Sequence, residues 1–247
     1  MKIYTGVEQG SEAWLALRIG IPTASMFGKI VTTKKAELSA QAHNYALRLV
    51  AERLLNTPAT LFGGDFSGPW MERGRELEPM AVKQYEFEHD VQTVPVAFIT
   101  TDDGRLGCSP DRLVVSKQRI GLEIKSPSPQ VHLGYLLDGL DDDHKPQIQG
   151  QLLVGELDRV DLYSYNPAMP PALIQTVRDE PYAAKLQAAL LRFADILDDM
   201  TTRARAIGAF QPTARATTPS EIREIADINR EFRVENERRF VKEGWTG

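Results

Sequence analysis

Three polar residues near the middle of the chain have the types and the spacing of a metal-dependent hydrolytic site. Asp111 is separated by eleven residues from the sequence Glu123-Ile124-Lys125. Side chains alternate along a strand, so Glu123 and Lys125 share one face while Ile124 points to the other. A turn between the two segments would fold them together and bring Asp111 within one residue of the position opposite Glu123. Two carboxylates and an amine are therefore predicted to converge.

This cluster suits Mg²⁺, which prefers oxygen ligands, keeps several waters and is usually held by one or two carboxylates plus substrate phosphate. A bound metal can polarise a phosphodiester and lower the pKa of a bound water, while Lys125 can orient that water or stabilise developing charge. The pattern favours hydrolytic phosphoryl chemistry. The alternative is structural: Asp111 caps a turn, and Glu123 and Lys125 form an exposed pair on a strand. Isolated matches of this kind are common, so the neighbouring segments must decide.

The elements that must position these residues are a sheet and the helices beside it. Strand patterns cover residues 91–100, 113–116, 121–125, 159–165 and 173–178. Helical patterns cover residues 39–55, 71–89, 146–154 and 182–207. Ser39 is expected to cap the first helix, and Pro79 should bend the second or mark its true start. This order predicts an α/β (α+β) fold, a mixed β-sheet flanked by helices.

The 247 residues can form a substantial core, and they contain no repeat, no signal peptide and no apolar run long enough to span a membrane. The composition changes only after Phe210, so we expect one domain over residues 1–210 and a linker with a helical appendage over residues 211–247. Cys108, the single cysteine, excludes internal disulfides and Cys-rich zinc folds and is expected in the core. The default expectation is a cytoplasmic protein with no membrane partner.

The charge balance bears on nucleic-acid binding. The chain has 29 Lys and Arg against 34 Asp and Glu, a net charge of -5, which argues against a protein that coats nucleic acid without specificity. Residues 18–53 nevertheless carry six basic and two acidic side chains. This segregation is compatible with a local DNA-binding groove, although ordinary lysines on a helix surface would give the same count.

Five ordered motifs carry a family resemblance. They are Glu8-Gln9-Gly10-Ser11 with Trp14, Leu17-Arg18-Ile19-Gly20 and Thr23-Ala24-Ser25; Gly74 to Glu78; Gly107-Cys108-Ser109-Pro110-Asp111-Arg112-Leu113; Leu122-Glu123-Ile124-Lys125; and Gln147-Ile148-Gln149-Gly150-Gln151. Together they resemble the phage lambda exonuclease and YqaJ-type viral recombinase family, within the PD-(D/E)xK nucleases. The resemblance implies a restriction-endonuclease-like core and leaves residues beyond 211 without a counterpart.

The resemblance also assigns roles at the metal site. Asp111, Glu123 and the backbone carbonyl of Ile124 would bind the metal, and Lys125 would be the catalytic lysine. The implied cofactor is Mg²⁺, with Mn²⁺ as a substitute and two ions when substrate is bound.

Two helical residues would complete this site. Glu78, as a metal ligand, and Gln147 would approach it from their helices and position the second metal or the attacking water. For Glu78 the alternative is a solvated face of a Glu-rich helix. For Gln147 the alternative is capping of a helix N-terminus.

A second group of residues would bind the DNA end. Arg18 would bind the 5′-terminal phosphate with help from the hydroxyls of Ser25 and Ser109, because a guanidinium suits phosphate geometry. A surface ion pair is the alternative for Arg18, and Trp14 is expected to be a core anchor. Relatives place a basic residue after the catalytic lysine, where this chain has only His132, so the phosphate pocket is expected to be weaker or differently built.

The function implied by the resemblance is a Mg²⁺-dependent exonuclease. It would degrade the 5′-ended strand of linear double-stranded DNA in the 5′-to-3′ direction and leave 3′ single strands for recombination by strand annealing. The implied assembly is a ring-shaped homotrimer that works with a single-strand annealing protein. A restriction-type endonuclease on the same core and a non-catalytic DNA-binding or scaffold module are the alternatives.

Overall fold

The computed structural model describes residues 1–58, 69–208 and 210, so the linker and appendage expected over residues 211–247 lie outside it. The helices are α1 (Glu12–Leu17), α2 (Phe27–Ile30), α3 (Ala42–Leu55), α4 (Pro69–His89), α5 (Pro129–Asp138), α6 (Lys145–Val154) and α7 (Glu180–Ile207), with short 3-10 turns η1 (Ala24–Met26) and η3 (Asp142–His144). No helix in this described part is long and apolar enough to cross a membrane.

The strands form two sheets. They are β1 (Lys2–Tyr4), β2 (Thr93–Pro95), β3 (Phe98–Thr100), β4 (Gly107–Cys108), β5 (Arg112–Val114), β6 (Ile120–Lys125), β7 (Arg159–Ser164) and β8 (Ala172–Thr176). The larger sheet has the order β2-β5-β6-β7-β8, and the smaller has the order β1-β3-β4. Strands β6 and β7 are parallel and the other pairs are antiparallel. The predicted mixed sheet is therefore confirmed, and α5 and α6 form the crossover that the parallel pair requires.

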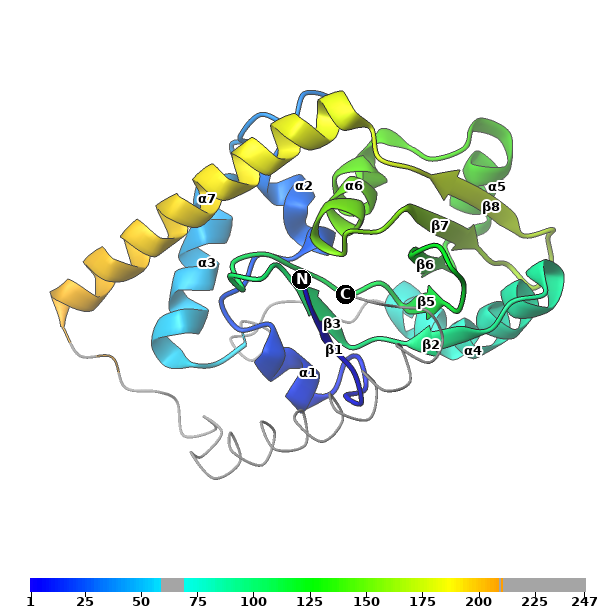
Figure 1. The fold of residues 1–247 in the computed structure, drawn as a ribbon, viewed down its shortest axis with the longest axis horizontal. Helices are drawn as coiled ribbons and strands as arrows, with labels where there is room; N and C mark the ends of the chain where they lie inside the picture. Colours follow the sequence, from blue (N-terminus) through cyan, green and yellow to red (C-terminus); the bar gives the residue numbers. More distant parts are fainter. Residues whose placement is uncertain (59–68, 209, 211–247) are drawn as a thin grey trace.

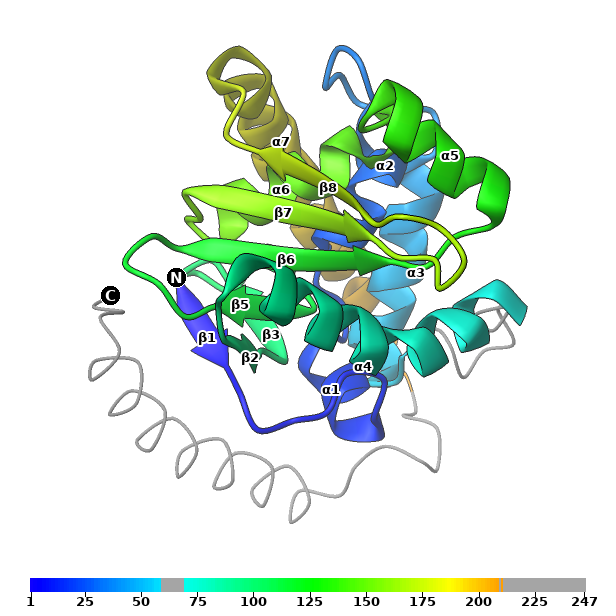
Figure 2. The same cartoon turned by 90° about the vertical axis from the view of Figure 1, so that its right-hand side faces the viewer.

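Helices cover both faces of the larger sheet (Figures 1 and 2). Helix α4 lies on one face, where Ala81 and Tyr85 pack against Leu122 and Tyr163 of the sheet. Helices α2, α3, α6 and α7 lie on the other face and enclose the larger hydrophobic core. Burial of these two apolar faces holds the strands of the larger sheet between helix layers.

Two local predictions need correction, and one of the two alternatives for a third is excluded. The apolar stretch 91–100 is not one strand, because β2 and β3 belong to different sheets. Helix α3 begins at Ala42 rather than beside Ser39, whose hydroxyl accepts from the Gln41 N–H and donates to the Lys29 carbonyl instead of capping the helix. For Pro79 two outcomes were expected, a bend or the start of the helix; α4 continues through this residue, so the second is excluded.

Helix α5 was not predicted from the sequence. Four large apolar side chains on it are 37–78 % exposed: Val131, Leu133, Leu136 and Leu137. Apolar residues therefore occupy several sides of this helix, which hides the periodicity that an amphipathic helix would show. Its position matters because it directly follows the strand that carries Glu123 and Lys125.

Candidate active site

The structure brings Asp111 and Glu123 together at the start of β5. Arg112 pairs with Leu122 across β5 and β6, so the preceding residue, Asp111, falls at the position opposite Glu123. The Asp111 carboxylate accepts a hydrogen bond from the backbone N–H of Ile124 at 2.6 Å. This bond ties the residue before β5 to the strand that carries the Glu-x-Lys sequence.

Three N–H donors hold the Glu123 carboxylate, which is 4 % exposed. Its Oε1 accepts from Lys125 Nζ and from Gln147 Nε2, each at 2.7 Å, and its Oε2 accepts from Gln151 Nε2 at 2.6 Å. Gln147 and Gln151 are four residues apart on α6 and so share one face of the helix. The sequence analysis named Gln147 and overlooked Gln151, although this spacing could have found it.

Burial and neighbouring charges shift the pKa values of Asp111 and Lys125. Burial first, and the charge of Glu123 second, raise the pKa of Asp111 well above its usual range, against the opposing effects of Lys125 and the Ile124 N–H. Burial alone would lower the pKa of Lys125, but the charges of Glu123 and Asp111 outweigh it and raise that pKa. Lys125 is therefore held as a cation beside both carboxylates, and the charge of Glu123 disfavours ionisation of Asp111.

This donor set fits Mg²⁺. Buried carboxylates that repel each other gain most from a divalent cation, because it favours the charged form of both. No three acidic, His or Cys side chains in the described part of the chain form a ready-made metal cage. Mg²⁺ does not require one, since it usually binds one or two carboxylates, several waters and substrate phosphates.

Asp111 makes a testable contribution to stability. Its raised pKa means that the folded protein binds this proton more tightly than the unfolded chain does. For the metal-free protein, the free energy of unfolding should therefore fall as pH rises from about 4 through the raised pKa of Asp111. We expect Asp111→Asn to remove this contribution in EDTA, and Mg²⁺ to offset it in the wild type. Thermal unfolding curves of both proteins across pH check this, and parallel pH dependences would contradict it.

Glu78 is half-buried on α4 and interacts electrostatically with the same site. Burial raises its pKa, the charge of Arg112 opposes the shift, and the charge of Glu123 adds to it. The pKa of Asp111 also responds to Glu78. Glu78 therefore lies within electrostatic range of both carboxylates and is not on a fully solvated helix face.

We expect Glu78→Ala to reduce hydrolysis severely and to weaken the response to Mg²⁺, because the negative charge that acts on Asp111 and Glu123 would be lost. Rates measured across a Mg²⁺ titration check this. Glu76→Ala, at an exposed position on the same helix, is the matched control. An unchanged Mg²⁺ requirement and rate in Glu78→Ala would return Glu78 to the solvated-face interpretation.

Arg18 lies in a half-buried setting that suits an anion. Its Nη1 donates to Ser109 Oγ at 2.8 Å and its Nη2 to Thr23 Oγ1 at 3.1 Å, while Cζ lies 4.0 Å from the centre of the Trp14 ring. Burial lowers the pKa of Arg18 to about 10. Among the described residues Arg18 forms no ion pair, so its charge is held by neutral hydroxyls and an aromatic face.

The remaining candidates for the phosphate site differ in how the structure places them. Ser109 contacts Arg18 directly, whereas Ser25 is exposed and reaches only Thr23, with 3.4 Å between the hydroxyl oxygens. Thr23, to which the sequence analysis gave no role, is thus a direct contact of Arg18. Trp14 donates from Nε1 to the Ala97 carbonyl at 2.8 Å, which fixes the ring beneath Arg18.

His132 and Cys108, which were discussed from the sequence, are both buried. His132 is fully buried, and its ring nitrogens contact Ser164 Oγ at 2.7 Å and the Pro170 carbonyl at 2.9 Å, so it does not replace the missing basic residue of the phosphate pocket. Cys108 is buried in the core, and burial raises the pKa of its thiol.

Several basic side chains of segment 18–53 are already paired with acidic residues. Three of its six cations form ion pairs: Lys34 with Asp142, Arg48 with Glu52, and Arg53 with Asp198. The count alone therefore does not define a DNA-binding groove.

Solved exonucleases have a similar fold. The chain resembles an alkaline exonuclease (LHK-Exo) from Laribacter hongkongensis with a TM-score of 0.69 and 26 % identity, covering 79 % of this chain and 97 % of that one. The same exonuclease in complex with dAMP gives a TM-score of 0.69 and 27 % identity over the same shares. A phage-related exonuclease from Haemophilus somnus 129PT shows the fold alone, with a TM-score of 0.57 and 15 % identity over 74 % and 96 % of the two chains. No curated protein gives a significant match.

Fold and site together define a PD-(D/E)xK nuclease of the lambda-exonuclease-like class. Residues 13–158 match the YqaJ-like viral recombinase domain, which accounts for more than half of the chain. The chain belongs to this family, and the resemblance stated from its sequence motifs is confirmed.

Proposed function

We propose that the protein is a Mg²⁺-dependent exonuclease that degrades the 5′-ended strand of linear double-stranded DNA and leaves 3′ single strands for strand annealing. The observation that carries this proposal is the joint placement of two sites. Asp111, Glu123 and Lys125 converge, and Arg18, which forms no ion pair within the described part of the chain, donates to Ser109, two residues before Asp111. A terminal phosphate at Arg18 would then lie at a fixed offset from the site of cleavage.

At the cleavage site, each side chain has a separable task. Asp111, Glu123, the Ile124 carbonyl and Glu78 would hold the metal, which supplies Lewis-acid activation of the phosphodiester and of water. Lys125 keeps its proton and stabilises the negative charge that develops on the phosphate. Gln147 and Gln151 hold the Glu123 carboxylate in one orientation.

At the DNA end, Arg18 would bind the 5′ phosphate through charge-assisted hydrogen bonds. Ser109 accepts a hydrogen bond from Nη1 of Arg18 and Thr23 accepts one from Nη2. These two bonds fix the orientation of the guanidinium group. Arg18 is half-buried and has no carboxylate partner among the described residues, so it would bind an incoming anion without first breaking an ion pair. This arrangement supports preference for a phosphorylated end.

The family membership supports two further proposals about assembly: a ring-shaped homotrimer and cooperation with a single-strand annealing protein. Light scattering of the purified full chain measures the first, with the mass of three chains as the expected result. A stable monomer that digests DNA fully would contradict it.

The activity test compares linear and closed circular duplexes with and without Mg²⁺. We expect digestion of the linear duplex only, and only with the metal present. Cleavage of the closed circle would support a restriction-type endonuclease. Tight DNA binding without any cleavage in Mg²⁺ or Mn²⁺ would support a non-catalytic module.

A further inference from the structure

The backbone of Gly20 is held from both sides by consecutive residues at the end of α3. Its N–H donates to Glu52 Oε2 at 2.9 Å in a buried contact, and its carbonyl accepts from Arg53 Nε at 2.8 Å. Gly20 has φ +65°, and a Cβ built on it would lie 2.2 Å from Arg53 Cγ. Only glycine therefore suits this position, both in its backbone conformation and in the close approach of Arg53.

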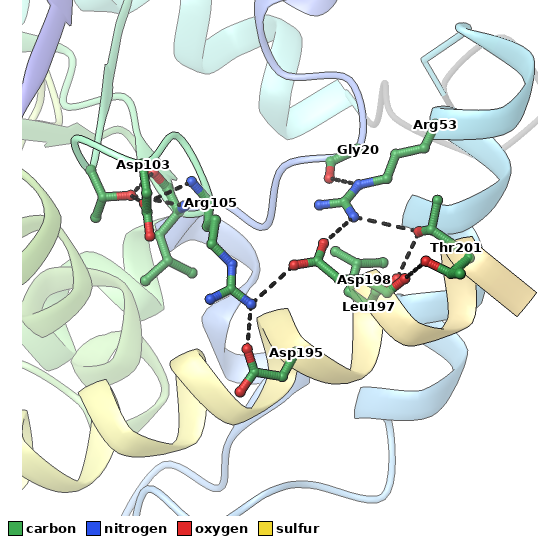
Figure 3. A network of polar contacts seen from close by, with 11 residues as sticks. Gly20, Arg53, Asp103, Arg105, Asp195, Leu197, Asp198 and Thr201 are labelled. Carbon is green, nitrogen blue, oxygen red and sulfur yellow. Dashed lines mark hydrogen bonds and ion pairs between the residues drawn. The ribbon is translucent and has the colours of Figure 1, made fainter.

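Arg53 in turn belongs to a charged network on α7 (Figure 3). Its Nη1 lies 2.7 Å from Asp198 Oδ1 and 3.4 Å from Thr201 Oγ1. The other oxygen of Asp198 lies 3.0 Å from Arg105 Nη2, and Arg105 also pairs with Asp195. Asp198 thus lies between two guanidinium groups that come from different parts of the fold.

Both guanidinium groups hold segments that lead to the proposed 5′-phosphate site. This site, called the receptor below, consists of Arg18, Thr23 and Ser109. Gly20 follows Arg18 by two residues and precedes Thr23 by three. Arg105 lies two residues before β4 (Gly107–Cys108), and Ser109, the other partner of Arg18, directly follows that strand. The donors around the proposed phosphate therefore come from two segments whose common anchor is Asp198.

We propose that Arg53 and Asp198 are positioning residues for Arg18. Arg53 holds the Gly20 peptide, and Asp198 holds Arg53 at a fixed position relative to Arg105. These two sets of contacts set the distance between Arg18 and Ser109. This inference rests on the proposed recognition of a 5′ phosphate, and it adds residues that never touch DNA to the determinants of that specificity. Asp198 is half-exposed, and ion pairs of this kind contribute little to stability. Its removal should therefore disturb placement more than folding.

The neighbouring residue on α7 provides a matched control. Asp199 is also exposed and also pairs with an arginine, but its partner, Arg203, lies on the same helix. We compare Asp198→Ala and Asp199→Ala in the full chain by two measurements. The first is hydrogen exchange of the peptide covering residues 18–26 without DNA. The second is the ratio of single-turnover rates on duplexes with 5′-phosphate and 5′-hydroxyl ends.

We expect Asp198→Ala to speed exchange in residues 18–26 and to lower the rate ratio by about tenfold, the scale of one charge-assisted contact to phosphate. Asp199→Ala should change neither quantity. In an Arg18→Ala background, Asp198→Ala should have almost no further effect on the ratio, because its effect acts through Arg18. Asp198→Glu keeps the charge and should retain most of the preference.

The contrary outcomes are distinguishable. If the wild type digests duplexes with 5′-phosphate and 5′-hydroxyl ends equally fast, the proposed end recognition is contradicted. The positioning role of Asp198 is then contradicted as well, before any α7 variant is made. A wild type that prefers the phosphate, together with an Asp198→Ala protein that behaves like Asp199→Ala, contradicts the positioning role alone. Equal slowing of both substrates by Asp198→Ala, or an undiminished effect in the Arg18→Ala background, would show a general structural role instead.

Discussion

Alanine at Asp111, Glu123 or Lys125 is expected to remove nearly all hydrolysis while the protein stays folded. These side chains act on charge at the reacting phosphate, and loss of one such preorganised interaction typically slows an enzyme by about 100- to 1000-fold. Single-turnover rates on linear duplex in Mg²⁺ measure the loss. Thermal unfolding and circular dichroism of the same samples show whether the fold is kept.

Two comparisons make this result specific. Lys117→Ala, at an exposed position in the turn between β5 and β6, removes a nearby lysine outside the site and should leave the rate unchanged. Glu123→Gln retains the size of a side chain that has buried partners, and it should be as inactive as the alanine variant. A folded Glu123→Ala protein with near wild-type turnover would disprove the assignment of the site.

Arg18→Ala should slow digestion of 5′-phosphorylated duplex by about 10- to 100-fold. A charge-assisted contact to phosphate contributes about 1.5–3 kcal/mol, and each 1.4 kcal/mol corresponds to about a factor of ten. Duplex with a 5′-hydroxyl lacks the partner of Arg18 and should be affected much less. Single-turnover rates on both substrates at matched salt give the contrast.

Lys29→Ala is the control for this effect, because Lys29 is exposed in the same basic segment and does not contact the receptor. It should change the two rates by similar small factors. If Arg18→Ala slows both substrates alike, Arg18 follows the DNA backbone or supports the fold, and end recognition must be assigned to other residues.

The parts of the site that could be predicted from the sequence depend on residue spacing within short segments. The separation of Asp111 from the Glu-x-Lys sequence fits an antiparallel pair with one turn, and side-chain alternation then fixes which residues share a face. The helix carrying Gln147 was predicted over residues 146–154 and is observed at Lys145–Val154. In both cases neighbouring residues along the chain carry the information.

The parts that escaped prediction depend on distant contacts. Thr23 contacts Arg18 in a segment that forms a β-bridge to Gly107. No local sequence pattern predicts this bridge. The split of residues 91–100 occurs where Pro95 ends β2, yet Val96 and Ala97 stay buried, so the apolar run continues across the break. Three-dimensional pairing, not composition, decides these features.

The central claim is tested most directly by strand polarity on a duplex with a single phosphorylated 5′ end. Each strand carries its own internal label, the other 5′ end is a hydroxyl, and both strands are followed during one reaction in Mg²⁺. The account predicts early loss of the strand that begins at the phosphate, while its complement persists as a 3′ single strand. Degradation that starts at 3′ ends, or equal loss of both strands from the start, would contradict it.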